Sequence, residues 1–143
     1  MSYGFSFHAH AHAHAHETDG SSAVILVDTN AWVSHVRSTD QRLVGMLNQN
    51  RVVTCDVVIG ELLLGAGLPR GLTAALALIP RLGSPTAAET LAFVQRHIGL
   101  FRSSGVGWAD AQIIAAGAHA GALLYSSDTA VRKTWRRLGY RMP

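Results

Sequence analysis

A short run of β-favouring apolar residues constrains the fold of this chain more than any other feature. Residues 23–27 read AVILV without a polar interruption, and Asp28, Thr29 and Asn30 follow at once. A strand with one solvated face alternates apolar and polar residues, whereas a strand covered on both faces is apolar throughout. The run therefore predicts a buried strand of a parallel sheet that delivers polar side chains at its carboxyl end.

The rest of the chain alternates between helical and strand-like segments. We expect a helix directly after the first strand, further helices over residues 41–47, 57–64, 72–79, 86–101, 108–119 and 129–138, and further strands over residues 51–54 and 122–125. Asp56 is expected to cap the helix that begins at residue 57. Strands separated by helices favour an α/β domain built on a central parallel sheet.

The first 22 residues stand outside this pattern. Five His residues alternate with Ala between His8 and His16 and lead into a polar linker. Such regularity is typical of an affinity tag, and a natural metal-binding tail is the alternative. We therefore expect residues 1–22 to be an expression tag and linker. Residues 23–143 are long enough for one domain with a real core, but not for two.

The charge balance beyond the tag is basic. Nine acidic residues include Glu17 and Asp19 of the expected tag, which leaves seven against twelve basic residues, eleven of them Arg. Arg suits the binding of phosphates, so a polyanionic partner is favoured, although solubility alone explains the balance equally well. Charged residues make up 15% of the chain, below the roughly 25% usual for globular domains. Part of the apolar surface is therefore expected to meet a partner.

The chain shows no membrane segment and one thiol. No apolar run reaches the roughly 18 residues that a membrane span requires. Cys55 has no second cysteine to pair with, and it reads as a small buried apolar residue rather than a nucleophile. These features predict a soluble protein of the reducing cytoplasm.

Four acidic residues stand where the predicted elements bring them to one edge of the sheet: Asp28, Glu61, Asp110 and Asp128. Taken singly, three of them can be helix caps or first-turn residues. Glu61 is different because apolar residues surround it along its helix, and a buried carboxylate needs a cation or a polar cleft. Since parallel strands open their binding sites at their carboxyl ends, we expect the four side chains to converge there.

Carboxylates that converge repel one another unless a cation neutralises them. Oxygen ligands favour Mg²⁺, with Mn²⁺ as a second possibility, over zinc, which prefers His and Cys. His35, His97 and His119 are scattered along the chain and read as ordinary core or surface residues. The pattern therefore predicts a magnesium site made of acids.

Four segments of the chain read ILVDTNAWV, VVIGELLLGA, GWADAQIIAAGAHAGALLYSSD and LGYRM. With these segments, residues 24–143 resemble the PIN-domain nucleases, and within them the VapC-like toxins of bacterial toxin–antitoxin pairs. The resemblance implies a three-layer α/β/α sandwich, the four acids as metal ligands, and Thr29, Asn30 and Ser127 as polar support. It also implies an endoribonuclease that cuts single-stranded or loop RNA, forms a homodimer and is inhibited by a cognate antitoxin.

Two positions depart from the family pattern. Asp56 opens the helix that carries Glu61, where the family usually has a small residue or Ser or Thr. Thr129 follows Asp128, where the family often has an aromatic residue. The second departure makes Asp128 the least secure of the four ligands.

The expected chemistry is hydrolysis of a phosphodiester by a metal-activated water. The last helix would add a basic face for RNA phosphates, made of Arg132, Lys133, Arg136 and Arg137, although a solvated face is the simpler interpretation. A receiver domain would need a Lys after the last strand, and a haloacid-dehalogenase-type phosphatase would need Asp in place of Asn30. A PIN fold without activity, which binds RNA or protein, is the serious alternative.

Overall fold

The computed structural model describes residues 23–65 and 68–143. The expected tag, residues 1–22, lies outside the described residues. The described part contains three strands and eight helices, one helix more than predicted, and they follow one another in the predicted order. No helix in these two ranges is long and apolar enough to cross a membrane.

A small parallel sheet forms the centre of the domain. Its strands are β1 (Ile25–Val27), β2 (Val52–Val53) and β3 (Leu123–Tyr125), in the order β2-β1-β3. Both neighbours run parallel to β1, which pairs Ile25 with Val52 and with Leu123. The residues of β1 are 0% exposed, so the uninterrupted apolar run marks a strand covered on both faces, as predicted.

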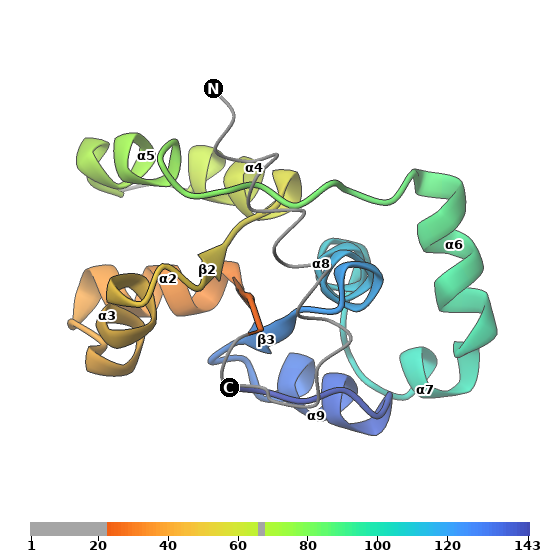
Figure 1. Ribbon diagram of the computed structural model, residues 1–143. Helices are drawn as coiled ribbons and strands as arrows, with labels where there is room; N and C mark the ends of the chain where they lie inside the picture. Colours follow the sequence, from red (N-terminus) through yellow and green to blue (C-terminus); the bar gives the residue numbers. More distant parts are fainter. Residues whose placement is uncertain (1–22, 66–67) are drawn as a thin grey trace.

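Helices cover both faces of this sheet. They are α2 (Thr29–Arg37), α3 (Gln41–Asn48), α4 (Asp56–Leu64), α5 (Arg70–Leu76), α6 (Ala87–Arg96), α7 (Ile98–Arg102), α8 (Trp108–Ala120) and α9 (Thr129–Arg137). In Figure 1, α4 and α5 lie on one side of the sheet and α9 lies on the other. The architecture is the predicted three-layer α/β/α sandwich.

The packing of α8 against α9 and β1 depends on one glycine. A Cβ atom on Gly117 would lie 3.2 Å from the Trp135 ring and 3.4 Å from the Leu26 side chain. Trp135 is completely buried, and its indole N–H donates to the carbonyl of Arg141 at 2.7 Å. Gly117 therefore lets two helices approach closely over the largest side chain of the core.

Helix boundaries differ from the prediction in three places. Asp56 is not a cap: Cys55 occupies the cap position, and Asp56 begins α4 and pairs with Arg81 at 3.2 Å. The segment 86–101 forms two helices because the chain turns at His97, which lets Phe93 and Phe101 pack edge to face. The segment 72–79 is shifted, since α5 starts after Pro69 and ends at Leu76.

Candidate active site

Asp28 is the most buried acid of the described residues. It follows β1, caps α2 and is 1% exposed. One carboxylate oxygen accepts from the backbone N–H of Thr29 at 2.8 Å, and the other accepts from the Ser126 hydroxyl at 2.6 Å. Because Ser126 follows β3, this contact joins the carboxyl ends of two neighbouring strands. The capping role that the sequence allowed for Asp28 is therefore present in the structure.

The ionisation of Asp28 shows that other acids lie near it. Burial raises its pKa to about 6, the hydrogen bonds from Ser126 and Thr29 oppose this rise, and the charges of Asp110 and Glu61 add to it. Burial also raises the pKa of Asp110, and the charges of Asp128 and Glu61 raise it further. The four acids that the sequence singled out thus lie within one electrostatic field.

Glu61 projects from α4 toward the start of α2. It is half-buried, and its Oε1 accepts a hydrogen bond from the Thr29 hydroxyl at 2.6 Å. This contact gives the carboxylate a polar partner on an otherwise apolar helix, as its placement required. Thr29 also donates its backbone N–H to Asp28, so this one residue contacts two of the four acids.

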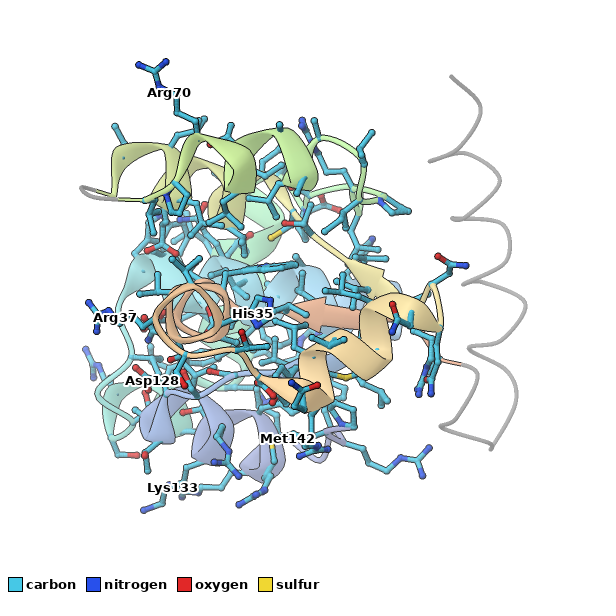
Figure 2. All side chains as sticks on the ribbon, turned by 90° about the vertical axis from the view of Figure 1, so that its left-hand side faces the viewer. His35, Arg37, Arg70, Asp128, Lys133 and Met142 are labelled. Atoms are coloured by element: carbon cyan, nitrogen blue, oxygen red, sulfur yellow. The ribbon has the colours of Figure 1, made fainter. Side chains whose placement is uncertain are left out.

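Asp128 stands at the start of α9. Its Oδ1 accepts from the backbone N–H of Val131 at 3.0 Å, so it caps this helix, and its Oδ2 accepts from the Asn30 amide at 3.3 Å. Figure 2 shows Asp128 beside α2, whereas Lys133 points from α9 in the opposite direction. The first two residues of α2, Thr29 and Asn30, therefore tether Glu61 and Asp128 respectively.

Ser126 is a site residue that sequence reasoning missed. Its hydroxyl donates to Asp28 and accepts from the backbone N–H of Asp128 at 3.0 Å. The predicted support residue, Ser127, is exposed and lies 3.5 Å from the Ser34 hydroxyl. Strand alternation does not separate the two serines, because Leu123 and Leu124, on opposite faces of β3, are both buried.

The donor set fits a hard divalent cation. It consists of carboxylates and hydroxyls, which are ligands that Mg²⁺ and Mn²⁺ prefer. Among the described residues, the ion pair between Arg81 and Asp56 involves none of the four acids. The chemistry of the site therefore leaves room for a positive ion.

The side chains do not, however, stand as a finished ligand shell. Among the described residues, no group of three or more His, Cys, Asp or Glu is arranged so that it could hold a metal ion. The oxygens of Asp28 and Asp128 accept hydrogen bonds from helix N-termini and from Ser126 and Asn30.

Two other predictions concern residues around the site. Cys55 is 1% exposed, and burial raises the pKa of its thiol, as expected for a packing residue. The predicted basic face of α9 is exposed, and Val131 and Trp135 are buried on the other side of this helix. The basic face consists of Arg132, Lys133, Arg136 and Arg137.

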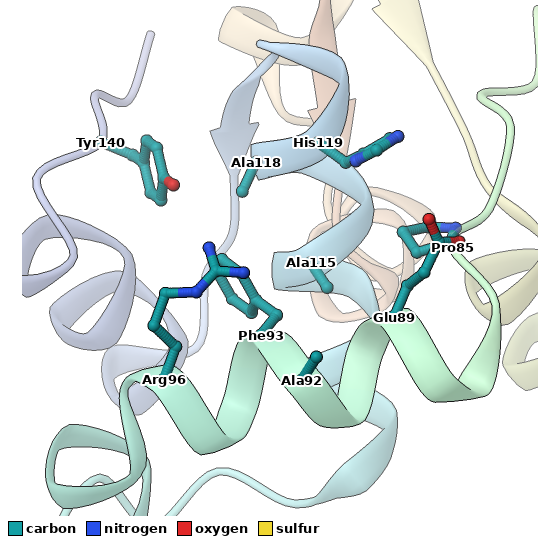
Figure 3. Close-up of a pocket in the computed structure, with 9 residues that line it drawn as sticks. All are labelled: Pro85, Glu89, Ala92, Phe93, Arg96, Ala115, Ala118, His119 and Tyr140. Atoms are coloured by element: carbon teal, nitrogen blue, oxygen red, sulfur yellow. The ribbon is translucent and has the colours of Figure 1, made fainter.

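Two surface pockets differ in size, and the larger of them lies away from these acids. Its volume is about 380 Å³, and it opens between α6 and α8, with Phe93, Arg96, His119 and Tyr140 around it (Figure 3). None of the four acids lines it. The smaller pocket, of about 180 Å³, includes Ser126 and therefore adjoins the candidate site.

The fold is an α/β/α sandwich with four acids near the carboxyl ends of its strands, and comparison with known proteins identifies its family. Residues 25–136 match the PIN domain family, so this chain belongs to that family. It is also similar to Ribonuclease VapC32 of two strains of Mycobacterium tuberculosis, with 44% identity over 43 residues. This match covers 30% of this chain and 35% of the relative. The chain thus spans about a third of the length of the curated relatives it matches.

Proposed function

We propose that this PIN domain is a metal-dependent endoribonuclease that acts as the toxin of a toxin–antitoxin pair. One observation carries the proposal: Asp28 is buried at the end of β1 with its pKa raised to about 6, partly by the charges of Asp110 and Glu61. Such an arrangement costs folding free energy unless a cation is bound, and costly clusters of this kind are typical of functional sites. The similarity to Ribonuclease VapC32 supports RNA as the substrate.

The proposed metal ligands are Asp28, Glu61, Asp110 and Asp128, and the proposed ion is Mg²⁺, with Mn²⁺ as a substitute. When bound, such an ion lowers the pKa of a water molecule and neutralises charge on the phosphodiester. The chain's own contribution is to hold the carboxylates in place. Thr29 orients Glu61, Ser126 orients Asp28, and Asn30 orients Asp128.

The substrate and partner assignments follow from charge and exposure. The basic face of α9 begins one turn after Asp128, so its cations would bind RNA phosphates beside the acids. Leu63, Leu64 and Leu78 are 60%, 90% and 79% exposed, which supports a protein partner for this apolar surface. We propose that the partner is the antitoxin, and a homodimer in the cytoplasm remains our prediction.

An inactive PIN fold that binds RNA or protein is the second candidate. It is favoured by the capping roles of Asp28 and Asp128, which would preserve both residues without catalysis. Glu61 distinguishes the two candidate functions, because it lies inside α4 and caps no helix, so a capping role cannot account for it.

The test is RNA cleavage by tag-free protein in Mg²⁺ or in EDTA, with Glu61→Gln as the diagnostic variant. The ribonuclease proposal expects cleavage that EDTA abolishes and that falls at least a hundredfold in Glu61→Gln. Glu89→Gln is the matched control, because Glu89 is an exposed carboxylate on α6 outside the cluster. Wild-type protein that binds structured RNAs but cuts none of them in Mg²⁺ or Mn²⁺ would favour the inactive module.

A further inference from the structure

The smaller pocket lies directly beside the candidate active site. It is bounded by the face of α2, the start of α3, the end of β3, the first turn of α9 and residues 142–143. Ser126 belongs to its lining and also donates to Asp28. Whatever occupies this pocket is therefore one side chain away from the most buried acid of the site.

Two guanidinium groups face this pocket from different elements. Arg42 comes from α3 and Arg132 from α9, and both line the cavity. The Arg42 guanidinium lies 5.6 Å from the centre of the Tyr125 ring. Burial and Asp40 raise the pKa of Tyr125, and the positive charges of Arg42 and Arg132 oppose that rise, so both cations lie near the phenol.

One carboxylate of the pocket lining, that of Asp40, is already engaged in hydrogen bonds. Asp40 accepts from the Tyr125 hydroxyl at 2.5 Å and from the backbone N–H groups of Arg42 and Leu43 at 3.0 and 3.3 Å. Partial burial opposes ionisation of Asp40, but these hydrogen bonds outweigh it and lower its pKa. Asp40 therefore serves as a structural anchor for α3.

Hydroxyl groups complete the lining on the side of the acids. Ser34 from α2 and Ser127 after β3 are exposed, and their oxygens are 3.5 Å apart. Each can donate its proton to a ligand rather than to the other. The pocket thus combines guanidinium and hydroxyl donors, which is the donor set that phosphate oxygens accept.

We propose that this pocket binds a phosphate group of the RNA strand, adjoining the phosphodiester held at the four acids. The inference rests on the proposed ribonuclease function and names a subsite for it. A volume of about 180 Å³ suits a phosphate group, and it is below the roughly 300 Å³ at which small-molecule pockets begin. Of the four cations on α9, Arg132 is the one in this lining, and Arg42 joins it from a distant part of the chain.

Arg132 is the residue to test because Arg42 also donates to the carbonyl of Pro143 at 2.9 Å and so helps to build the pocket wall. Inorganic phosphate is titrated into metal-free, ¹⁵N-labelled protein, and amide shifts are followed by NMR. We expect the amides of Ser34 and Ser127 to shift and phosphate affinity to fall about tenfold in Arg132→Ala. Arg132→Lys should recover part of the affinity.

Arg96→Ala is the matched control, since it removes one exposed guanidinium from the larger pocket of Figure 3. It should leave phosphate affinity unchanged. In a second step, a single-stranded oligoribonucleotide added to the phosphate-loaded protein should reverse the shifts at Ser34 and Ser127. Circular dichroism of each variant verifies that the fold is retained.

The outcomes separate this inference from the proposed function. Equal phosphate affinity in Arg132→Ala and wild type, or shifts confined to other residues, would overturn the pocket assignment. If the protein cleaves RNA but added RNA does not displace phosphate from the pocket, the pocket does not bind a phosphate of the RNA strand, and the ribonuclease function still stands. Protein that neither binds nor cleaves RNA would overturn both the ribonuclease function and this subsite.

Discussion

Ser126 donates a hydrogen bond of 2.6 Å to Asp28, although 98 residues separate them in the chain. The contact exists because β1 and β3 are parallel neighbours, so their carboxyl ends lie side by side. Ser126 also accepts from the backbone N–H of Asp128. One buried hydroxyl therefore connects the first and the last of the four acids.

Ser126→Ala is expected to destabilise the protein by about 1 to 3 kcal/mol near neutral pH, because it leaves a buried carboxylate without one of its donors. Ser127→Ala, one residue on and exposed, should change the free energy of unfolding by less than about 0.5 kcal/mol. Urea unfolding of both variants measures the difference. Equal effects would show that the Ser126 hydroxyl does not support Asp28.

The metal-free protein is expected to lose stability as the pH rises from about 4 to about 6. The pKa of Asp28 is raised from 3.8 to about 6 in the folded protein, so the folded state binds the proton more tightly than the unfolded state does. Stability therefore falls as the pH rises through this window, by roughly 3 kcal/mol from this group.

Urea unfolding in EDTA across this pH range tests the prediction. Asp28→Asn is the matched variant, because it keeps the shape of the side chain and removes its titration. The free energy of unfolding of the wild type minus that of the variant should fall as the pH rises. A difference that stays flat, or that rises with pH, would contradict the raised pKa.

Asp110→Asn is expected to abolish cleavage without unfolding the protein. It removes one of the charges that raise the pKa of Asp28, so the metal-free variant should melt at a higher temperature than the wild type does. With saturating Mg²⁺ the wild type should melt at the higher temperature instead, because the variant lacks a proposed metal ligand and gains less stability from the ion. Cleavage at the wild-type rate in Mg²⁺ would exclude Asp110 from the catalytic set.

Gly117→Ala is expected to destabilise the protein by about 1 to 3 kcal/mol, since its Cβ would lie 3.2 Å from the Trp135 ring. Gly45 offers the matched control: it lies inside α3, and nothing stands within 4 Å of its Cβ position. Gly45→Ala should therefore stabilise the protein by roughly 0.5 to 1 kcal/mol. Thermal unfolding of the two variants should shift in opposite directions.

The sequence predicted the central parallel sheet and the order of the elements because these depend on local patterns, and the family resemblance implied the three layers. The apolar run before Asp28 marks β1, and the period of buried residues in α9 marks its inner face. The break at His97 was not predicted, because neither Pro nor Gly stands at this position in the sequence, and it brings Phe93 and Phe101 into edge-to-face contact.

For the site, too, the sequence predicted what the order of the elements decides and not what tertiary contacts decide. Carboxyl ends of parallel strands meet at one edge, so topology sufficed to bring Asp28 and Asp128 together. Which side chains would orient them depends on contacts between distant segments, such as that of Asn30 with Asp128. The Ser126 contact and the pocket of Arg42 and Arg132 required the three-dimensional structure for the same reason.

The basic face of α9 should control the salt dependence of RNA binding. Each phosphate that a cation neutralises contributes a slope of about −0.7 in log affinity against log salt for single strands. The double variant Arg136→Ala/Arg137→Ala should therefore reduce the slope by roughly 1 to 1.5. Binding is measured with Ca²⁺ in place of Mg²⁺, and Arg96→Ala/Arg102→Ala, which removes two exposed cations from α6 and α7, is the control. An unchanged slope in the α9 variant would show that Arg136 and Arg137 do not contact RNA phosphates.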